Sequence, residues 1–379
     1  MYLSNVKLYN FRNLKDTQVF LNPGLNFLIG KNGQGKTNFV EAIAFLASTK
    51  SFRTSKRSEL IAFESEETSV FGSVSNIDQQ VDIGIALSKG KLKAFIFGEQ
   101  VQSVDKYLSK LLAVIFSPTD ISLVKGAPAE RRSFLDQHVL NLGLLTLSTL
   151  VGFQRALTGR ARILKSDVRH ETTELGVHLD SWDKIFIEYA LKLVEARKSL
   201  VEQITPVFQR CYSDLSKSET VSLELESPFL EDGEVIGVEH GLHLLNKSRD
   251  RDMLYRSTHI GPHRDDLMVT INGSDARSYS SQGQARSIVL ALLLAVIELI
   301  EQRVGVSPVV VLDDVDSELD RDRAAALFSG VISKERQVLV TGTALHPSLE
   351  NDPQITIYKV EDGSLTLVRS PTTTKLAIG

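Results

Sequence analysis

Short apolar stretches separated by polar turns fill roughly the first 115 residues and predict a series of β-strands. The two-residue alternation is clearest at Val81, Ile83, Ile85 and Leu87, as in a strand with one buried face. The stretch Asn38–Leu46 instead has the apolar spacing of a helix. The other predicted strands are Leu3–Leu8, Val19–Leu21, Leu25–Ile29, Val70–Val74, Lys93–Phe97 and Ala113–Phe116.

The middle of the chain, from Glu130 to about Tyr212, has a helical pattern. Pro206 should kink or end its last helix, because proline has no backbone N–H to donate. Val221–Leu225 resembles a strand that leads out of this segment. The apolar positions with helical spacing are Phe186, Ala190, Leu193, Leu200, Ile204 and Val207, and Arg197 interrupts them.

The α/β pattern returns after about Leu254, with a long predicted helix at Ala285–Gln302. We therefore predict an α/β fold with a mixed sheet. Residues 1–125 and 251–379 would form its head, and residues 126–250 an inserted, mainly helical arm. The late predicted strands are Met268–Ile271, Pro308–Leu312 and Gln337–Thr341.

Composition favours a cytoplasmic protein without a membrane partner. The 379 residues are 42% hydrophobic and 24% charged, as in a globular protein with a real core. A single cysteine, Cys211, excludes an internal disulfide and fits a reducing compartment. The longest apolar stretch, Ile288–Ile300, is broken by Glu298 and is too short to span a bilayer. With a net charge of −4, any DNA contact must come from a local basic surface.

The strongest motif is a phosphate-binding loop that matches G-x-x-x-x-G-K-[ST] without a mismatch. The predicted strand Leu25–Ile29 precedes it and the predicted helix follows it, an arrangement that turns backbone N–H groups toward a polyphosphate. Lys36 would contact the β- and γ-phosphates, and the Thr37 hydroxyl would bind Mg²⁺. The loop contains Gly30, Lys31, Asn32, Gly33, Gln34, Gly35, Lys36 and Thr37.

Two further motifs complete a predicted nucleotide site. The apolar run Val309–Leu312 ends in Asp313, which would complete the Mg²⁺ shell directly or through water, and Asp314, which would orient or deprotonate the attacking water. A buried strand that ends in two acids is common in proteins. It indicates a nucleotide site here because the phosphate-binding loop is present in the same chain. Ahead of the long helix, Ser281, Gln282, Gly283 and Gln284 make either an anion site or a simple N-cap.

Together these motifs resemble the heads of ABC-type ATPases. In such heads the serine-glycine signature of one subunit covers the γ-phosphate held by the other subunit. The resemblance therefore implies that residues 281–284 contact ATP in trans, and that Ser317–Asp320 lies at the dimer contact. Gln282 departs from transporters, which have glycine there. Thr341-Gly342-Thr343 occupies the region of their histidine, and we assign His346 no role.

Other stretches narrow the resemblance to the RecF family of SMC-like ATPases. Phe11-Arg12-Asn13 is similar to the start of SMC-type heads, where the arginine, here Arg12, approaches phosphate. Four stretches of this chain are similar to sequences characteristic of the RecF family. They are Phe116–Ile121, Leu123–Pro128, Arg131–Asp136 and Gly261–Leu267. The resemblance implies a slow, DNA-stimulated, Mg²⁺-dependent ATPase that dimerises with ATP and clamps duplex or gapped DNA. It also implies work with RecR in loading the RecA recombinase.

The histidine in Gly261–Leu267 does not predict a metal site, because His263 with Asp265 and Asp266 gives no closed ligand set. A structural role and a DNA-facing role for His263 and Arg264 both stay open at this point.

Two basic clusters are candidate DNA contacts, although each also fits a solvated helix face. The resemblance favours contact with the DNA backbone. No aromatic ladder for stacking single-stranded bases is visible, which favours duplex or junction binding. One cluster is Lys50, Arg53, Lys56 and Arg57, and the other is Arg155, Arg160, Arg162, Lys165 and Arg169.

Two rival functions remain to be separated. A metabolic P-loop kinase would need an acceptor pocket and lid arginines, and the helical arm offers a lid. An ABC transporter subunit fits less well, because the long arm is present and the transporter-type histidine is absent.

Overall fold

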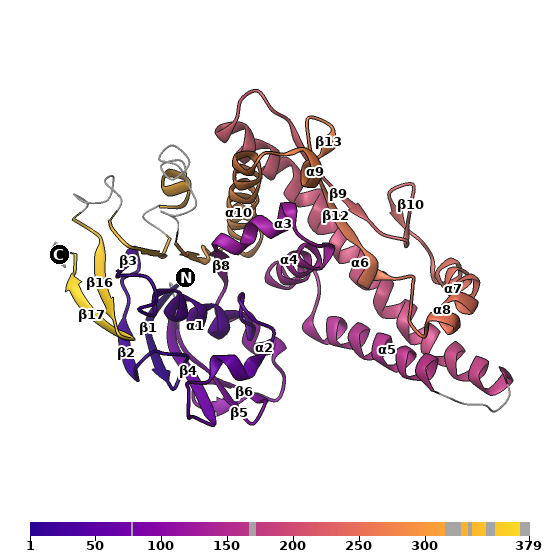
Figure 1. The fold of residues 1–379 in the computed structure, drawn as a ribbon, viewed down its shortest axis with the longest axis horizontal. Coiled ribbons are helices and arrows are strands. Elements are labelled where there is room, and N and C mark those ends of the chain that lie inside the picture. Colours follow the sequence, from indigo (N-terminus) through magenta and orange to yellow (C-terminus); the bar gives the residue numbers. More distant parts are fainter. Residues whose placement is uncertain (77–78, 167–171, 315–326, 333–335, 346–352, 372–379) are drawn as a thin grey trace. The chain divides into compact units, whose positions relative to one another are not determined.

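We describe a computed structural model of the chain, which covers residues 1–76, 79–166, 172–314, 327–332, 336–345 and 353–371, with the side chains of 172–176 left aside. Contacts divide the chain into two compact units (Figure 1). Unit 1 contains residues Met1–Asp120 and Leu290–Gly379, and unit 2 contains Ile121–Val289. The α/β class with an inserted, mainly helical part is confirmed.

Unit 1 is built on two sheets with a helix, α1 (Lys36–Ser48), packed against both of them (Figure 1). The first sheet is antiparallel, in the order β2-β1-β4-β5-β6-β7. Its strands are β1 (Tyr2–Tyr9), β2 (Thr17–Phe20), β4 (Glu67–Ser75), β5 (Gln80–Ser88), β6 (Lys91–Ile96) and β7 (Glu99–Gln100). Short helices η1 (Arg57–Leu60) and α2 (Asp105–Leu108) lie in its connections.

The second sheet of unit 1 has the order β17-β16-β3-β15-β14-β8 and is parallel except for the β16–β17 hairpin. One hydrophobic core joins both sheets through α1, whose Phe39, Val40, Ile43 and Phe45 are fully buried. The strands of this sheet are β3 (Leu25–Ile29), β8 (Ala113–Phe116), β14 (Val309–Leu312), β15 (Val338–Gly342), β16 (Thr356–Glu361) and β17 (Ser364–Arg369).

Unit 2 is mainly helical, and its longest helices, α5 and α6, pack along each other (Figure 1). A small antiparallel sheet, β13-β12-β9, completes it. Its helices are η2 (Pro118–Ile121, shared with unit 1), α3 (Ser122–Lys125), α4 (Pro128–Asn141), α5 (Leu147–Lys165), α6 (Thr172–Leu215), α7 (Val238–Lys247), α8 (Arg249–Tyr255), η3 (Pro262–Arg264) and α9 (Ala276–Tyr279). Its strands are β9 (Val221–Glu226), β10 (Leu230–Glu231), β11 (Glu234–Val235), β12 (Asp266–Ile271) and β13 (Ser274–Asp275).

The compact units differ from the predicted boundaries at residues 125 and 250. Strand β12 pairs with β9 in antiparallel register, from Asp266 opposite Glu226 to Ile271 opposite Val221. This pairing ties residues that follow 250 to unit 2, together with the start of α10 (Gln282–Val304). The helix α6 also continues through Pro206 to Leu215 and does not end at the proline.

Helix α10 is long and apolar enough to cross a membrane by length and composition alone. However, 72% of its most apolar window is buried inside the protein. This burial identifies α10 as a core helix, in agreement with the sequence analysis.

Buried arginine–aspartate pairs hold unit 2 together and explain the Gly261–Leu267 motif. Arg197, 2% exposed, donates to Asp265 Oδ2 at 2.7 Å and to Asp136 Oδ1 at 2.7 Å. Arg131 makes a bidentate pair with Asp266 at 2.6 and 2.8 Å. Asp265 and Asp266 of this motif are thus each paired with an arginine inside unit 2.

His263 has a structural position. Its ring lies near those of Phe153 and Phe186, and its Nε2 is 2.9 Å from the carbonyl oxygen of Thr258. Burial lowers the pKa of His263 to about 4, and the charges of neighbouring arginines act in the same direction. The ring is therefore neutral near pH 7 and donates to Thr258. Arg264, by contrast, is exposed.

Candidate nucleotide site

The phosphate-binding loop connects β3 to α1 and has the backbone that its glycines permit. Gly33 and Gly35 have φ values of 80° and 111°, in the left-handed region that disfavours other residues. At Gly30 an added Cβ would lie 2.3 Å from the carbonyl oxygen of Val360. Gly35 is the N-cap of α1 and provides no side-chain cap, so the first N–H groups of this helix are open to an anion.

Lys36 is buried at the start of α1, with 6% of its surface exposed. Its Nζ donates to the carbonyl oxygens of Gly30 at 2.7 Å and Lys31 at 3.0 Å. Burial lowers the pKa of Lys36, whereas the nearby charges of Asp314 and Asp313 raise it. The ammonium group is thus held within the loop by weak acceptors, from which a phosphate can draw it away.

Asp313 joins α1 to the end of β14. Its Oδ1 accepts hydrogen bonds from Thr37 Oγ1 at 3.1 Å and from Thr341 Oγ1 at 2.7 Å. Burial raises the pKa of Asp313, and the two threonine hydrogen bonds act against this. Asp314 has a left-handed φ of 50°, and its N–H donates to Thr341 Oγ1 at 2.9 Å. The Thr341 hydroxyl thus contacts both acids.

The oxygens of Thr37 and Asp313 fit a magnesium ion. Mg²⁺ binds hard oxygen ligands octahedrally at about 2.1 Å, so neighbouring ligand oxygens lie about 3.0 Å apart. The 3.1 Å between Thr37 Oγ1 and Asp313 Oδ1 agrees with this spacing. Among the described residues no group of three or more His, Cys, Asp and Glu could hold a metal. This is expected where phosphates and water supply the other ligands.

Arg12 is paired with a carboxylate that the sequence analysis did not single out. Its Nε and Nη2 donate to Glu41 at 2.9 and 2.7 Å, and the Glu41 side chain is fully buried. Arg53 donates to the same carboxylate at 3.1 Å and to Asn38 Oδ1 at 2.7 Å. Asn38 and Glu41 lie on α1, within the first two turns of the helix that Lys36 and Thr37 begin. Arg12 and Arg53 are therefore both linked to the first two turns of α1.

The hairpin turn between β16 and β17 supports the loop, and the sequence analysis missed it. The N–H of Asp362 donates to Gln34 Oε1 at 2.7 Å, and that of Gly363 to the Gln34 carbonyl at 3.0 Å. The sequence contains a signal, because Asp362-Gly363 is a strong hairpin turn and Tyr358 and Val360 alternate with polar residues before it.

Replacing Gly363 with Ala should weaken nucleotide binding by about tenfold and destabilise unit 1 by about 1–3 kcal/mol. The new Cβ would lie 2.1 Å from the carbonyl oxygen of Asn13, which forces the turn away from Gln34. Titration with ATP and thermal unfolding measure the two effects. Gly273 is the matched control, because its φ of 75° is nearly the same and nothing lies within 4 Å of its added Cβ. Equal losses in both variants would show that backbone strain, and not support of the loop, is responsible.

The signature residues cap α10 in unit 2. Ser281 Oγ accepts from the N–H of Gln284 at 3.1 Å, and the N–H of Ser281 donates to Gln284 Oε1 at 2.7 Å. This reciprocal pair is a capping box. Ser281 and Gln282 are exposed, and Gly283 is partly buried. The N-cap interpretation is therefore correct for the single chain.

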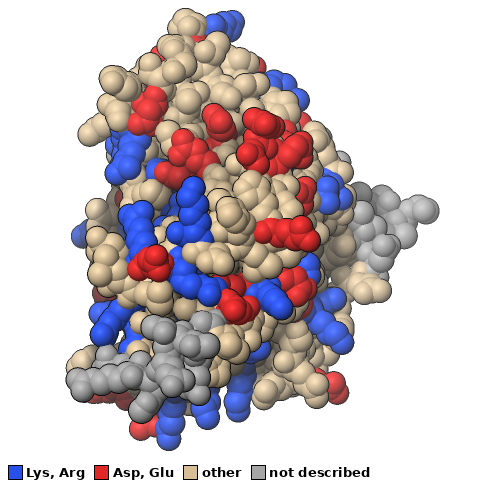
Figure 2. All heavy atoms as spheres, turned by 90° about the vertical axis from the view of Figure 1, so that its right-hand side faces the viewer, with Lys and Arg blue, Asp and Glu red and all other residues tan. Residues whose placement is uncertain are grey.

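The two basic clusters differ in their exposure. Lys50, Arg53, Lys56 and Arg57 are all exposed. In the second cluster Arg160 is fully buried and donates to Asp183 and Asp252, both at 2.7 Å, so it contacts neither solvent nor DNA. Arg155, Arg162 and Lys165 are exposed, and Arg169, Ser317–Asp320 and His346 lie outside the described residues. Figure 2 shows basic and acidic side chains interspersed over the face that it draws.

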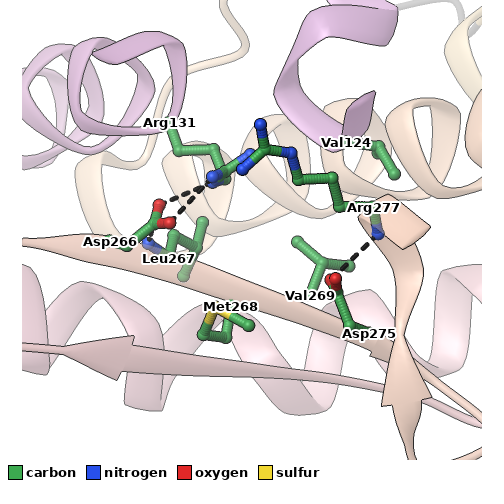
Figure 3. Close-up of a pocket in the computed structure, with 8 residues that line it drawn as sticks. All are labelled: Val124, Arg131, Asp266, Leu267, Met268, Val269, Asp275 and Arg277. Carbon is green, nitrogen blue, oxygen red and sulfur yellow. Dashed lines mark hydrogen bonds and ion pairs between the residues drawn. The ribbon is translucent and has the colours of Figure 1, made fainter. Parts of the chain in front are cut away.

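None of the predicted nucleotide residues lines the small pocket described in unit 2 (Figure 3). Asp266 in its wall is already paired with Arg131, and Asp275 accepts from the N–H of Arg277 at the start of α9. Its acids are thus satisfied within the chain. The pocket is lined by Val124, Arg131, Asp266, Leu267, Met268, Val269, Asp275 and Arg277.

Comparisons with known proteins agree with the resemblance drawn from the motifs. Residues 2–366 match the model of the RecF/RecN/SMC N terminal domain. The DNA replication and repair protein RecF of Streptococcus pneumoniae is 36% identical over 371 residues, which are 97% of this chain and 99% of that protein.

Solved structures give the same result. A structure described as the recombination mediator protein RecF-ATP in the RecFOR pathway is 32% identical, with a TM-score of 0.87 and 97% of each chain covered. An Smc head bound to the C-winged helix domain of ScpA is 17% identical, with a TM-score of 0.54 over 97% of this chain and 98% of that chain. At that identity the likeness to the Smc head shows the fold alone.

Proposed function

The chain belongs to the RecF family of SMC-like, ABC-type ATPases, and from this we propose that it is an ATP-dependent DNA-binding protein of recombinational repair and replication restart. ATP and Mg²⁺ would bind at the loop of residues 30–37, and two ATP-bound heads would form a homodimer that clamps duplex DNA at gaps. The relatives, named as DNA replication and repair proteins and found with ATP, support this proposal.

The observation that carries the proposal is that two elements distant in sequence, α1 and β14, meet at one point. Lys36 and Thr37 begin α1, Asp313 directly follows β14, and a hydrogen bond joins Thr37 to Asp313. In this arrangement Lys36 leaves the carbonyl oxygens of Gly30 and Lys31 for the β- and γ-phosphates. Thr37 and Asp313 would hold Mg²⁺, which neutralises charge that develops on the phosphate oxygens.

Asp314 is proposed to act on the attacking water. The left-handed backbone at this residue and the hydrogen bond from its N–H to Thr341 fix it one position beyond the metal-binding acid. A carboxylate so placed can accept the proton of water as it attacks the γ-phosphate. Hydrolysis would be slow and would serve as a switch.

The second half of the site is proposed to come from another copy of the chain. Ser281 and the exposed start of α10 offer a hydroxyl and the positive end of a long helix. ATP can drive dimerisation only if it binds the closed dimer more tightly than the monomer. A γ-phosphate held between Lys36 of one copy and Ser281 of the other meets this condition.

We propose that the DNA contact lies at Lys50, Arg53, Lys56 and Arg57. Arg53 is the member of this cluster that also contacts Glu41 and Asn38 on α1. A DNA phosphate that draws Arg53 away would therefore change the electrostatic surroundings of the nucleotide-binding helix. This supports stimulation of hydrolysis by DNA.

Replacing Arg53 and Lys56 with Ala together should weaken duplex binding about equally for all sequences. Each lost phosphate contact lowers the slope of log affinity against log salt by about 0.9. The salt dependence of binding to two unrelated duplexes measures this. Lys106 and Lys217, exposed lysines outside both clusters, form the control pair. Unchanged affinity at moderate salt would reject the cluster as a DNA contact.

The remaining partners are proposed from the family alone. They are RecR, gapped DNA and, through RecR, the RecA recombinase. The protein would act in the cytoplasm during the SOS response, with no membrane partner.

A direct test of the function is ATP turnover with duplex DNA and no small-molecule acceptor. A rise in turnover on adding the duplex supports the proposal, and turnover that requires an acceptor would indicate a P-loop kinase.

A further inference from the structure

The first sheet of unit 1 has one buried face and one open face. Val70, Ile83 and Ile85 point into the core and are almost fully buried. The residues between them along the strands point the other way, because side chains alternate across a strand. Phe71, on this opposite face, is only partly buried, and Lys7 is exposed.

Strand pairing brings two aromatic rings together on the open face. Lys7 lies opposite Phe71, Phe71 opposite Gly84, and Gly84 opposite Phe95. The ring centroids of Phe71 and Phe95 are 6.1 Å apart, although a whole strand separates their backbones. A Cβ added at Gly84 would lie 2.2 Å from the Phe71 ring. The glycine therefore makes room for the two rings to lie over its strand.

A third aromatic ring and a second lysine lie in the neighbouring row. Tyr9 is opposite Ser69, Ser69 opposite Ala86, and Ala86 opposite Lys93. Tyr9 is 46% exposed and Lys93 is also exposed. Only the small residues Ser69 and Ala86 lie between Tyr9 and Lys93 in this row.

The charge on these rows is positive. Lys7 and Lys93 are the charged residues of these two rows, and the rows on either side contain Asp82, which accepts from Ser73 Oγ at 2.6 Å, and Glu67, which lies opposite Ser88. We call Lys7, Tyr9, Phe71, Lys93 and Phe95 the stacking face. It combines partly exposed rings, which every base can stack on, with cations spaced across a rigid sheet.

We propose that the stacking face binds single-stranded DNA, with bases stacked on Phe71, Phe95 and Tyr9 and backbone phosphates near Lys7 and Lys93. The inference rests on the proposed function, because a gap presents unpaired nucleotides beside a duplex. Duplex DNA hides the faces of its bases and gains nothing from rings. The exposed cluster at Lys50–Arg57 has no such pair of rings and fits a duplex backbone.

The test compares single-stranded oligo(dT) with duplex of the same length, by anisotropy of a fluorescent end label. Replacing Phe71 and Phe95 together with Leu, which keeps apolar cover over Gly84, should lower affinity for the single strand at least about tenfold. Affinity for the duplex and for ATP should change less than about twofold. Phe63→Leu is the control, because Phe63 is 92% exposed and lies outside the stacking face.

A second variant leaves the packing of the sheet untouched. Lys7→Gln with Lys93→Gln should lower the slope of log affinity against log salt for the single strand by about 1.4, at about 0.7 for each contact. Wild-type affinity for oligo(dT) in both double variants, or an equal loss for duplex, would overturn the inference. A wild-type chain that binds duplex but not oligo(dT) would overturn it while leaving the proposed function intact.

Discussion

Replacing Lys36 with Ala should lower ATP affinity by about 100-fold, because two charge-assisted contacts with phosphate are lost at about 1.5 kcal/mol each. Hydrolysis should fall further, by about 10³-fold, since Lys36 also stabilises charge in the transition state. The free energy of unfolding should not decrease. Lys36 is buried against carbonyl oxygens and its pKa is lowered by that burial, so its removal relieves a desolvation cost.

ATP titration, steady-state hydrolysis and thermal unfolding together measure these effects. Lys106 is the control, because it is an exposed lysine of unit 1 outside the loop. Lys106→Ala should bind and hydrolyse ATP nearly as the wild type does. A Lys36→Ala variant that keeps wild-type affinity would place the triphosphate elsewhere in the chain.

Replacing Ser281 with Arg should leave ATP binding to the monomer unchanged and abolish the ATP-dependent dimer. The long cation would stand at the exposed start of α10, where Ser281 now caps the helix and where the second copy must approach. Hydrolysis should fall with the dimer, because a lone head encloses only part of the triphosphate. The loss of the cap should cost about 1 kcal/mol of stability, too little to unfold the protein.

Two comparisons make this result specific. Ser281→Ala removes the cap without adding bulk or charge, so it shows what the cap alone contributes. Ser281→Thr keeps both the cap and the hydroxyl and should dimerise with ATP. Dimers of Ser281→Arg as abundant as those of the wild type, seen by sedimentation, would remove the trans role of the signature.

The parts of the fold that local pattern determines were predictable. The strand Leu25–Ile29 was predicted with its observed bounds, and the loop and the start of α1 follow it directly. The run Val309–Leu312 is a buried strand with two acids at its end, also as predicted. In both cases the apolar period, the glycines and the charged residues lie within a few positions of one another.

Features that depend on distant partners were not predictable. Arg197 looks like an interruption of an apolar helix face, yet it is buried against Asp136 and Asp265, which are 61 and 68 positions away. Arg160 was grouped with surface cations for the same reason. Strand β17 was missed because Leu367 and Val368, on its opposite faces, are both exposed, so it has no alternation. Phe71 and Phe95 of the stacking face lie 24 positions apart in sequence, and only strand pairing brings their rings together.

The central claim is that one triphosphate is shared by two copies of the chain, and Asp314→Asn tests it most directly. Asn keeps the shape of Asp314 but cannot accept the proton of water, so ATP should bind and persist. Light scattering of this variant, without nucleotide, with ADP and with ATP, gives its mass in each state. We predict twice the chain mass with ATP and the chain mass in the other two states. A monomer in the presence of saturating ATP would contradict the account.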